Sequence, residues 1–202
     1  ALVRHAAERG LPVTIHRPAR VAGDSRTGVS NPDDYFSRML KTFVQLGSVP
    51  LWNGGPDLYP VDCLAAAIGQ ASRDPEAWGG GFHYYNNATL SYDDVAAALR
   101  RAGFRIRRLP YPQWRAQLLE RVESGEDIAL SMYAPLFPAE LSPIDPARAE
   151  PEWDCTRSQQ YAELAGAPCP PADVALLVRY LNYFRRTGYL EGRPARRGAA
   201  HV

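Results

Sequence analysis

Residues 16–23, HRPARVAG, end an apolar run with a proline between two arginines, an arrangement that could form a ligand-binding turn. The run before them, LPVTIH, is mostly apolar and rich in β-branched residues, which predicts a buried strand over residues 11–16. Pro18 has no amide N–H, so the strand ladder would end there. Ligands of open α/β sheets bind beyond the carboxyl ends of the strands. The backbone groups of Ala19 to Val21 would therefore be free to contact a ligand.

A structural role is the alternative for the same stretch. Pro18 would then only end the strand, while Arg17 and Arg20 would form ion pairs at the surface. The periodicity of the sequence alone favours this plainer interpretation, because nothing in the spacing itself requires a ligand.

Several nucleotide-binding and nucleophile motifs are absent from the sequence. The sixteen glycines never fall in G-x-G-x-x-G or G-x-x-G-x-x-G spacing, so no dinucleotide phosphate loop is expected. Lys41 is the only lysine, and it does not belong to a G-x-x-x-x-G-K-[ST] loop. No G-x-S-x-G elbow occurs either, which excludes the ordinary nucleophile of an α/β-hydrolase.

The histidines and cysteines do not predict a metal site. None of the four histidines lies in an H-E-x-x-H motif, and the three cysteines, Cys63, Cys155 and Cys169, lack C-x-x-C spacing. We therefore expect no bound metal. An odd number of cysteines without such spacing predicts reduced structural thiols, as is usual in the cytoplasm, which is the expected location.

Composition narrows the classes of partner. The formal net charge is +1 and 46% of the residues are apolar, values that are ordinary for a globular domain. No broad electrostatic field favours nucleic acid or an anionic membrane, so neither is an expected partner. No apolar run reaches the roughly 18 residues of a membrane span. The sequence opens in a helical pattern without an initiator methionine, and we expect it to begin partway through a longer protein.

Short helices and strands alternate along the chain. An alanine-rich helix over residues 1–9 is expected to end at Gly10, because glycine tolerates positive φ. Asn31 to Asp34 provide a cap, a proline and early acids for a helix that runs to Gly47. The other expected elements are a loop over 17–30, helices over 61–72, 113–122, 128–133, 156–164 and 172–186, strands over 82–85 and 104–109, and a helix capped by Ser91. This order predicts an α/β protein with a parallel sheet.

The stretch LVRHAAERGLPVTIHRPARVAGDSRTGVSN resembles the segment after the catalytic helix of extended short-chain dehydrogenase/reductases. It is most similar to the thioester reductase domains that terminate nonribosomal peptide synthetases and to the similar domains of carboxylic acid reductases. The features that carry this resemblance are A-x-x-R-G-L-P-V at 6–13, R-P-x-R-[VI]-x-G at 17–23, S-x-T-G at 25–28 and Asn31, with later matches over 57–68, 83–103 and 181–190. Together they cover about residues 1 to 190.

The resemblance implies a division of the chain. Residues 1–90 would be the C-terminal part of a Rossmann-like core, with an inserted substrate-side helix over 31–47. Residues 91–190 would form a mainly helical lid that binds substrate and carrier protein. Residues 191–202, which are rich in Arg, Gly and Ala, are expected to be disordered.

The resemblance also implies NADPH as cofactor and a catalytic Ser/Thr-Tyr-Lys set, in which Tyr and Lys form Y-x-x-x-K. Ser37 lies four residues before Lys41, so this chain has no such pair and contains no catalytic residue of the set. In the family that pair and the phosphate loop precede the segment that matches residues 1–9. We therefore expect the chain to be the C-terminal portion of a reductase, inactive alone, with the N-terminal Rossmann portion of its parent as partner.

Site residues follow from the same resemblance. Pro18, Ala19, Arg20 and Val21 would line the nicotinamide end of the cofactor. Substrate contacts are expected from five further residues, Gly23, Ser25, Thr27, Asn31 and Tyr35.

A carrier protein that presents its substrate on a phosphopantetheine arm needs a docking face on the lid. Six arginines could form a basic surface for an acidic carrier, although an ordinary solvated edge explains them equally well: Arg100, Arg101, Arg105, Arg107, Arg108 and Arg115. Five aromatic residues are expected in the core of the lid rather than against substrate: Tyr111, Trp114, Trp153, Tyr180 and Tyr183.

The leading hypothesis is thus the substrate-binding part of an NADPH-dependent reductase that releases a carrier-bound acyl or peptidyl thioester as an aldehyde or alcohol. A nucleotide-sugar epimerase or dehydratase is the first alternative. Those proteins share R-P-x-x-V-x-G but usually continue with a Gly-Pro-rich strand end, whereas residues 24–28 are DSRTG here. A non-catalytic docking module for a carrier protein is the second alternative.

Overall fold

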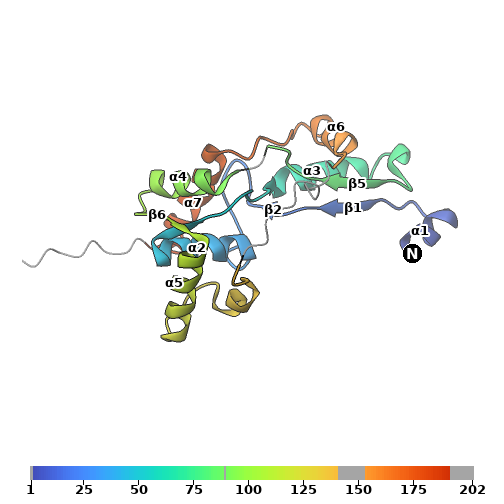
Figure 1. Cartoon of the computed structure of the whole chain (residues 1–202). Helices are drawn as coiled ribbons and strands as arrows, with labels where there is room; N and C mark the ends of the chain where they lie inside the picture. The colour runs from blue at the N-terminus through green and yellow to red at the C-terminus, as the bar shows by residue number, and fades with distance from the viewer. Residues whose placement is uncertain (1, 89, 141–152, 192–202) are drawn as a thin grey trace, which may run out of the picture.

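The computed structural model describes residues 2–88, 90–140 and 153–191. Its strands form three parallel pairs, β1 with β5, β2 with β4 and β3 with β6, which confirms the parallel α/β class. Figure 1 shows α1 at one end of the molecule and α2, α4, α5 and α7 grouped at the other. The elements are α1 (Leu2–Glu8), β1 (Ile15–Pro18), β2 (Val21–Ala22), α2 (Tyr35–Leu46), β3 (Ser48–Leu51), β4 (Tyr59–Pro60), α3 (Val61–Ala71), η1 (Pro75–Ala77), β5 (Gly81–Tyr84), α4 (Tyr92–Arg101), β6 (Arg107–Pro110), α5 (Tyr111–Glu123), η2 (Ser131–Leu136), α6 (Thr156–Leu164) and α7 (Val174–Arg186).

The strand expected over residues 11–16 lies further along the chain and is less buried than predicted. The ladder to β5 begins at Ile15, which pairs with Gly81, and it ends at Pro18, as the missing N–H requires. Leu11 is 58% exposed, and the side chains of β1 are half-buried or exposed. Within the described residues β1 has a neighbouring strand on one side only, which explains why it is less buried than its apolar sequence predicts.

The loop expected over residues 17–30 contains a short strand. Val21 pairs with Tyr59 and Ala22 with Pro60, so that β2 lies parallel to β4. Two residues carry no periodicity, and the pairing partner is far away in the sequence. The chain that leaves β1 is therefore fixed to β4 almost at once.

Local capping signals are confirmed in part. The helix expected over residues 31–47 begins later, because Asp34 and not Asn31 caps α2 by accepting a hydrogen bond from the backbone N–H of Ser37 at 2.6 Å. Its expected end at Gly47 is confirmed, with φ +66°. Ser91 and Asp94 form the expected capping box at the start of α4.

Two later elements differ in kind or extent. The strand expected over residues 104–109 is shorter, because β6 covers only Arg107–Pro110 beside β3. The helix expected over 128–133 is instead a 3-10 helix over Ser131–Leu136 that contains Pro135. Proline cannot donate the hydrogen bond that an α-helix needs at this point.

Two hydrophobic clusters hold the fold together. The larger one joins α2, β3, α4, α5, η2 and α7 around buried residues such as Phe43, Trp114 and Leu177. The smaller one joins β4, α3, β5 and α6 around Tyr59 and Phe82. The two clusters do not correspond to two successive halves of the chain. The early helix α2 packs with later helices in the larger cluster, whereas the late helix α6 packs on α3 in the smaller one. The division into residues 1–90 and 91–190 stays a prediction, and residues 192–202 lie outside the described residues.

The expected lid core is present for most of its aromatic members. Trp114, Tyr111 and Tyr180 are buried, and Tyr183 is half-buried against Phe184. Trp153 was wrongly placed with them, because 41% of its surface is exposed.

Three of the six arginines of the expected basic surface bond to other groups of the chain. Arg100 donates to the carbonyl of Ile106 at 3.0 Å, Arg115 donates to the carbonyl of Phe137 at 2.8 Å, and Arg108 pairs with Asp93. The other three, Arg101, Arg105 and Arg107, are exposed.

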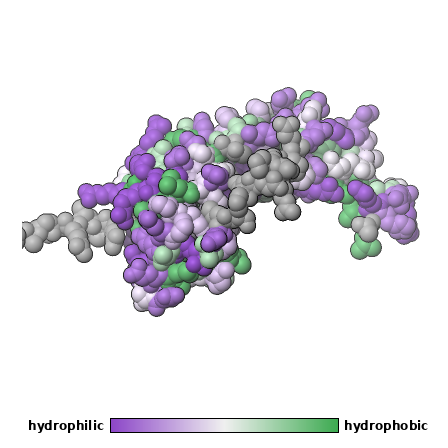
Figure 2. Space-filling model, viewed as in Figure 1, coloured by the Kyte–Doolittle hydropathy of each residue, from purple (hydrophilic) through white to green (hydrophobic). Residues whose placement is uncertain are grey.

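Apolar surface is visible at the end of the molecule where α1 lies (Figure 2). Leu2 is 87% exposed and Val3 is 49% exposed, and α1 buries none of its residues. This helix therefore adds nothing to either hydrophobic cluster. In the part of the chain that the structure describes, no helix is both long and apolar enough to cross a lipid bilayer.

Candidate functional site

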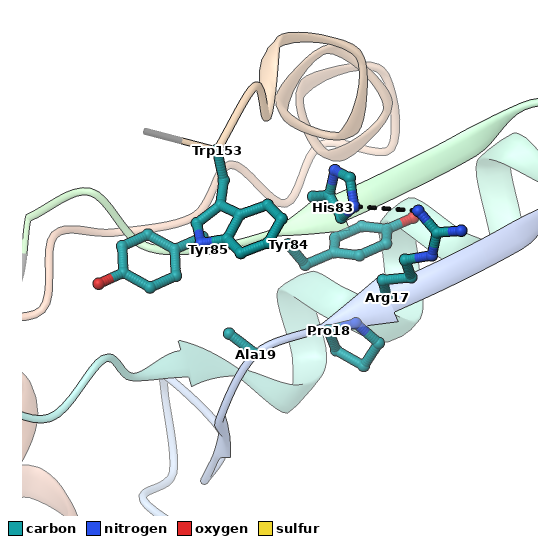
Figure 3. A pocket seen from close by; sticks show the side chains of 7 residues that line it. All are labelled: Arg17, Pro18, Ala19, His83, Tyr84, Tyr85 and Trp153. Carbon is teal, nitrogen blue, oxygen red and sulfur yellow. Dashed lines mark hydrogen bonds between the residues drawn. The ribbon is translucent and has the colours of Figure 1, made fainter. Parts of the chain in front are cut away.

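A cavity of about 560 Å³ lies where β1 and β5 end (Figure 3). Its lining comes from the carboxyl ends of both strands and from the segment before α6: Arg17, Pro18, Ala19, His83, Tyr84, Tyr85 and Trp153. Because β1 and β5 are parallel, residues that are 66 positions apart in the chain face the same space. The location agrees with the general rule for ligands of open α/β sheets.

The walls of the cavity are mainly aromatic. The indole of Trp153 lies with its ring centre 4.9 Å from that of His83, and Figure 3 shows it beside Tyr85, across the cavity from Ala19. At one end, Arg17 Nη1 and His83 Nε2 are 3.3 Å apart, within hydrogen-bonding distance. The cavity therefore offers flat apolar walls and one cationic end.

The base of the cavity is uncharged at neutral pH. The hydroxyl of Tyr84 lies 2.7 Å from His16 Nδ1, and Thr14 Oγ1 lies 2.8 Å from the other ring nitrogen. Burial lowers the pKa of His16 and raises the pKa of Tyr84 to about 12. His16 is thus a neutral, fixed group that orients Tyr84, and it does not line the cavity.

Of the four residues expected at the cofactor, the structure brings two to the cavity. Pro18 and Ala19 line it, whereas Arg20 and Val21 do not. The Arg20 guanidinium lies over the ring of Phe36 at 5.6 Å, and Val21 is 37% exposed.

The expectation that the backbone of Ala19 to Val21 is free for a ligand is wrong in part. The Ala19 N–H donates to the carbonyl of Tyr84 at 3.0 Å, and the Arg20 carbonyl accepts from the N–H of Tyr59 at 2.9 Å. Two neighbouring strands, β5 and β4, use these groups. Any ligand contact in this segment must come from the remaining groups and from side chains.

Three of the five expected substrate residues lie together in one turn, outside the cavity. Ser25 donates to Asp62 through its N–H at 2.8 Å and its hydroxyl at 2.7 Å. Thr27 donates to Asp24, and the Gly23 carbonyl accepts from the hydroxyl of Tyr180 at 3.0 Å. These bonds fix the turn between α3 and α7.

Asn31 and Tyr35 lie beyond this turn. Asn31 is exposed and accepts from the N–H of Asp33 at 2.9 Å. Tyr35 is half-buried and packs edge-to-face on Tyr133, with ring centres 5.2 Å apart. Burial raises the pKa of Tyr35, so its hydroxyl stays protonated and can donate a hydrogen bond. The roles of all five residues stay predictions.

Sequence reasoning assigned no site role to the five other lining residues, Arg17, His83, Tyr84, Tyr85 and Trp153. The segment FHYY was expected as a strand, but its pairing with β1 was not. Its aromatic residues at the end of a strand were the available signal, since parallel neighbours place their carboxyl ends at the same edge. Nothing in the local sequence places Trp153 here.

The cavity fits the nicotinamide end of a dinucleotide in shape and chemistry. A planar aromatic ring suits the walls formed by Trp153 and Tyr85, and the volume falls in the range of small-molecule sites. Metal binding has no comparable support. Among the residues that the structure describes, no group of three His, Cys, Asp or Glu side chains could hold an ion.

Comparison with known proteins identifies relatives over nearly the whole chain. Residues 1–68 match the NAD-binding family described as male sterility protein. The chain is 33% identical to the isonitrile lipopeptide synthase of Streptomyces coeruleorubidus over 207 residues, which is 98% of this chain and 14% of the synthase.

Solved structures agree with this relationship. The terminal R domain from the myxalamid PKS-NRPS biosynthetic pathway superposes with a TM-score of 0.80 and is 35% identical, over 95% of this chain and 48% of that domain. A thiolation-reductase di-domain from an archaeal non-ribosomal peptide synthetase shares the fold, with a TM-score of 0.70 and 24% identity over 94% of this chain and 39% of that one. The chain thus spans about half of the solved R domain. Its homologues include reductase domains of nonribosomal peptide synthetases, and it has the extended short-chain dehydrogenase/reductase fold of the solved R domain.

Proposed function

We propose that this chain forms the substrate side and part of the nicotinamide site of an NADPH-dependent thioester reductase. Its parent would release an acyl or peptidyl group from a carrier protein as an aldehyde or an alcohol. The observation that carries the proposal is the aromatic cavity at the ends of β1 and β5, where Pro18 and Ala19 meet Trp153. The 35% identity to an R domain supports it.

When bound, the nicotinamide would supply a hydride to the thioester carbonyl. Pro18 and Ala19 would form one face of its site, and Trp153 with Tyr85 would form the other and exclude water. The neutral pair of His16 and Tyr84 would keep the base of the site rigid and uncharged. The proton donor of the reaction would come from the N-terminal portion of the parent.

The substrate would enter beside the turn that contains Gly23, Ser25 and Thr27. This turn is fixed to α3 through Asp62 and to α7 through Tyr180, so it can hold one geometry while substrates vary. Asn31 and the protonated hydroxyl of Tyr35 would offer hydrogen bonds to the acyl or peptidyl chain.

The carrier protein would dock on the lid. Arg101, Arg105 and Arg107 are exposed, and within the described part of the chain their guanidinium groups have no bond like those that engage the other three arginines of the basic surface. An acidic carrier would meet these three first, and its association rate would fall with rising salt.

The test uses the parent protein extended upstream to its natural start. NADPH oxidation is followed after addition of an acyl-pantetheine thioester. Ala19→Phe fills the cavity and should lower kcat/KM by about 100-fold, because small displacements of bound reactants are costly. Ala116→Phe, at an exposed position on α5, is the matched control and should leave kcat/KM unchanged.

Other outcomes would contradict the proposal. Turnover of a nucleotide sugar without thioester-dependent oxidation would favour the epimerase or dehydratase alternative. Turnover of neither substrate would favour a docking module. The 202-residue chain alone should not oxidise NADPH, and a signal from it would overturn the proposed inactivity.

A further inference from the structure

Two of the three cysteines lie against each other beside α3. Cys63, in the first turn of α3, is 2% exposed, and its Sγ lies 3.7 Å from the carbonyl oxygen of Pro168. The next residue is Cys169, whose thiol donates to the carbonyl of Pro170 at 3.6 Å and interacts with the thiol of Cys63. Both thiols are free. Within the described residues, the buried Cys155 has no cysteine as a partner.

The segment that carries Cys169 is held in position by Asn86. The Asn86 side-chain nitrogen lies 3.6 Å from the Cys169 sulfur and donates to the carbonyl of Pro170 at 2.9 Å. Asn86 is itself buried and also contacts the carbonyl of Leu58 at 3.1 Å. Prolines on both sides of Cys169 restrict the backbone further. The two thiols are therefore held close together before any reaction takes place.

A small oxidant can reach Cys169, the more exposed thiol of the pair. Cys169 is half-buried and lines a polar pocket of about 130 Å³, together with Tyr59, Asn87 and Glu163. That volume is well above the ~15 Å³ needed to hold one water molecule. Hydrogen peroxide is little larger than water, so the pocket has room for it.

We propose that Cys63 and Cys169 form a peroxide-sensitive thiol pair that closes to a disulfide. One of the two sulfurs attacks one oxygen of peroxide, the O–O bond breaks, and hydroxide leaves and takes up a proton to form water. The product at that cysteine is a sulfenic acid. The other sulfur then attacks the sulfur of the sulfenic acid, the S–O bond breaks and a second water leaves. In total two thiols and one peroxide give one disulfide and two waters.

The roles of the two sulfurs follow from their surroundings. The hydrogen bond from Cys169 lowers the pKa of the Cys63 thiol, and the first turn of a helix also favours a thiolate. The same bond raises the pKa of Cys169, which remains the proton donor. Cys63 thus has the greater thiolate character, whereas Cys169 is the thiol that lines the pocket.

The disulfide would join α3 to the segment between α6 and α7. It links residues that are about a hundred positions apart, so it would restrict the unfolded chain strongly. We expect the midpoint of thermal unfolding to rise by about 10 °C on oxidation. The inference concerns thiol chemistry only and does not depend on the proposed reductase activity.

The experiment uses the purified 202-residue chain, treated with hydrogen peroxide or kept reduced, then alkylated in denaturant and digested with trypsin. Each cysteine falls in its own tryptic peptide, residues 42–73 for Cys63, 149–157 for Cys155 and 158–179 for Cys169. We expect a disulfide-linked pair of the first and third peptides, and an intact mass lower by two hydrogen atoms.

Three variants make the assignment specific. Cys63→Ser and Cys169→Ser should each abolish the link, and Cys169 is only half-buried, so its variant should fold. Cys155→Ser is the matched control and should retain the link. Full alkylation of all three thiols after peroxide, or a link that includes Cys155, would overturn the inference.

Discussion

The bond between the Ser25 turn and α3 can be tested by removing Asp62. This carboxylate accepts the N–H and the hydroxyl of Ser25 at 2.8 and 2.7 Å, and its side chain is 15% exposed. A hydrogen bond to a charged group contributes roughly 1.5–3 kcal/mol. Water can replace part of this at a partly exposed site. We therefore expect Asp62→Ala to lower the free energy of unfolding by about 3 kcal/mol.

Two further variants separate this bond from a general charge effect. Asp62→Asn keeps an acceptor for the N–H and an amide that can donate to the hydroxyl, so about 1 kcal/mol should be lost. Asp33→Ala removes an exposed ion pair with Arg38, in which Asp33 is 78% exposed, and should cost less than about 1 kcal/mol.

Urea unfolding followed by far-ultraviolet circular dichroism measures these differences. The denaturant dependence of the unfolding free energy should be the same in all variants, which would show that the amount of surface exposed on unfolding is unchanged. If Asp62→Ala and Asp33→Ala cost the same within error, the turn is not fixed by Asp62. The proposed positioning of substrate by this turn would then lose its structural basis.

Three other changes have outcomes that the structure predicts. Gly28→Ala should lower the free energy of unfolding, measured in urea, by more than about 2 kcal/mol, because the new Cβ would lie 2.5 Å from the carbonyl oxygen of Arg179. Gly10 has a similar positive φ but no atom within 4 Å of the new Cβ, so Gly10→Ala should cost only about 1 kcal/mol. Trp114→Ala should cost about 4 kcal/mol, since the side chain is fully buried in the larger cluster; a loss below about 2 kcal/mol would contradict that packing. Hydrogen bonds with Ser91 lower the pKa of Asp94 below its usual 3.8, so Asp94 stabilises the folded state above that pH and loses this effect as the pH falls further. In Asp94→Asn the free energy of unfolding should therefore decrease less steeply at acidic pH than in the wild type.

The parts of the fold that sequence predicted best are those determined within a few residues. The capping box at Ser91 depends on side chains that bond their own backbone, so the sequence contains all the information needed. The cap of α2 was expected at Asn31 but lies at Asp34, because several neighbouring residues of this segment can cap a helix. The strand over residues 11–16 was misplaced because its register depends on Gly81 and Tyr84, which lie far away in the chain. The two-residue strand β2 was missed for the same reason.

In the candidate site, too, the features determined by single residues were predicted and those that depend on distant strands were not. Pro18 was correctly expected at a strand end, because the lack of an N–H is a property of the residue itself. Whether the backbone groups that follow are free depends on β4 and β5, and these use the N–H of Ala19 and the carbonyl of Arg20. Trp153 reaches the cavity from the segment before α6, and its 41% exposure there separates it from the other aromatic residues of the expected lid core.

Helix α3 connects the two regions on which the proposals depend. Asp62 holds the Ser25 turn, while the adjacent Cys63 contacts the segment that leads into α7. Tyr180 on α7 bonds the same turn at Gly23, so the turn, α3 and α7 form a closed set of contacts between the two hydrophobic clusters. A change in the position of α3 relative to α7 would therefore alter the turn. A disulfide between Cys63 and Cys169 would add a covalent link between α3 and the segment that leads into α7. Asp62→Ala would instead remove the hydrogen bonds between α3 and the turn.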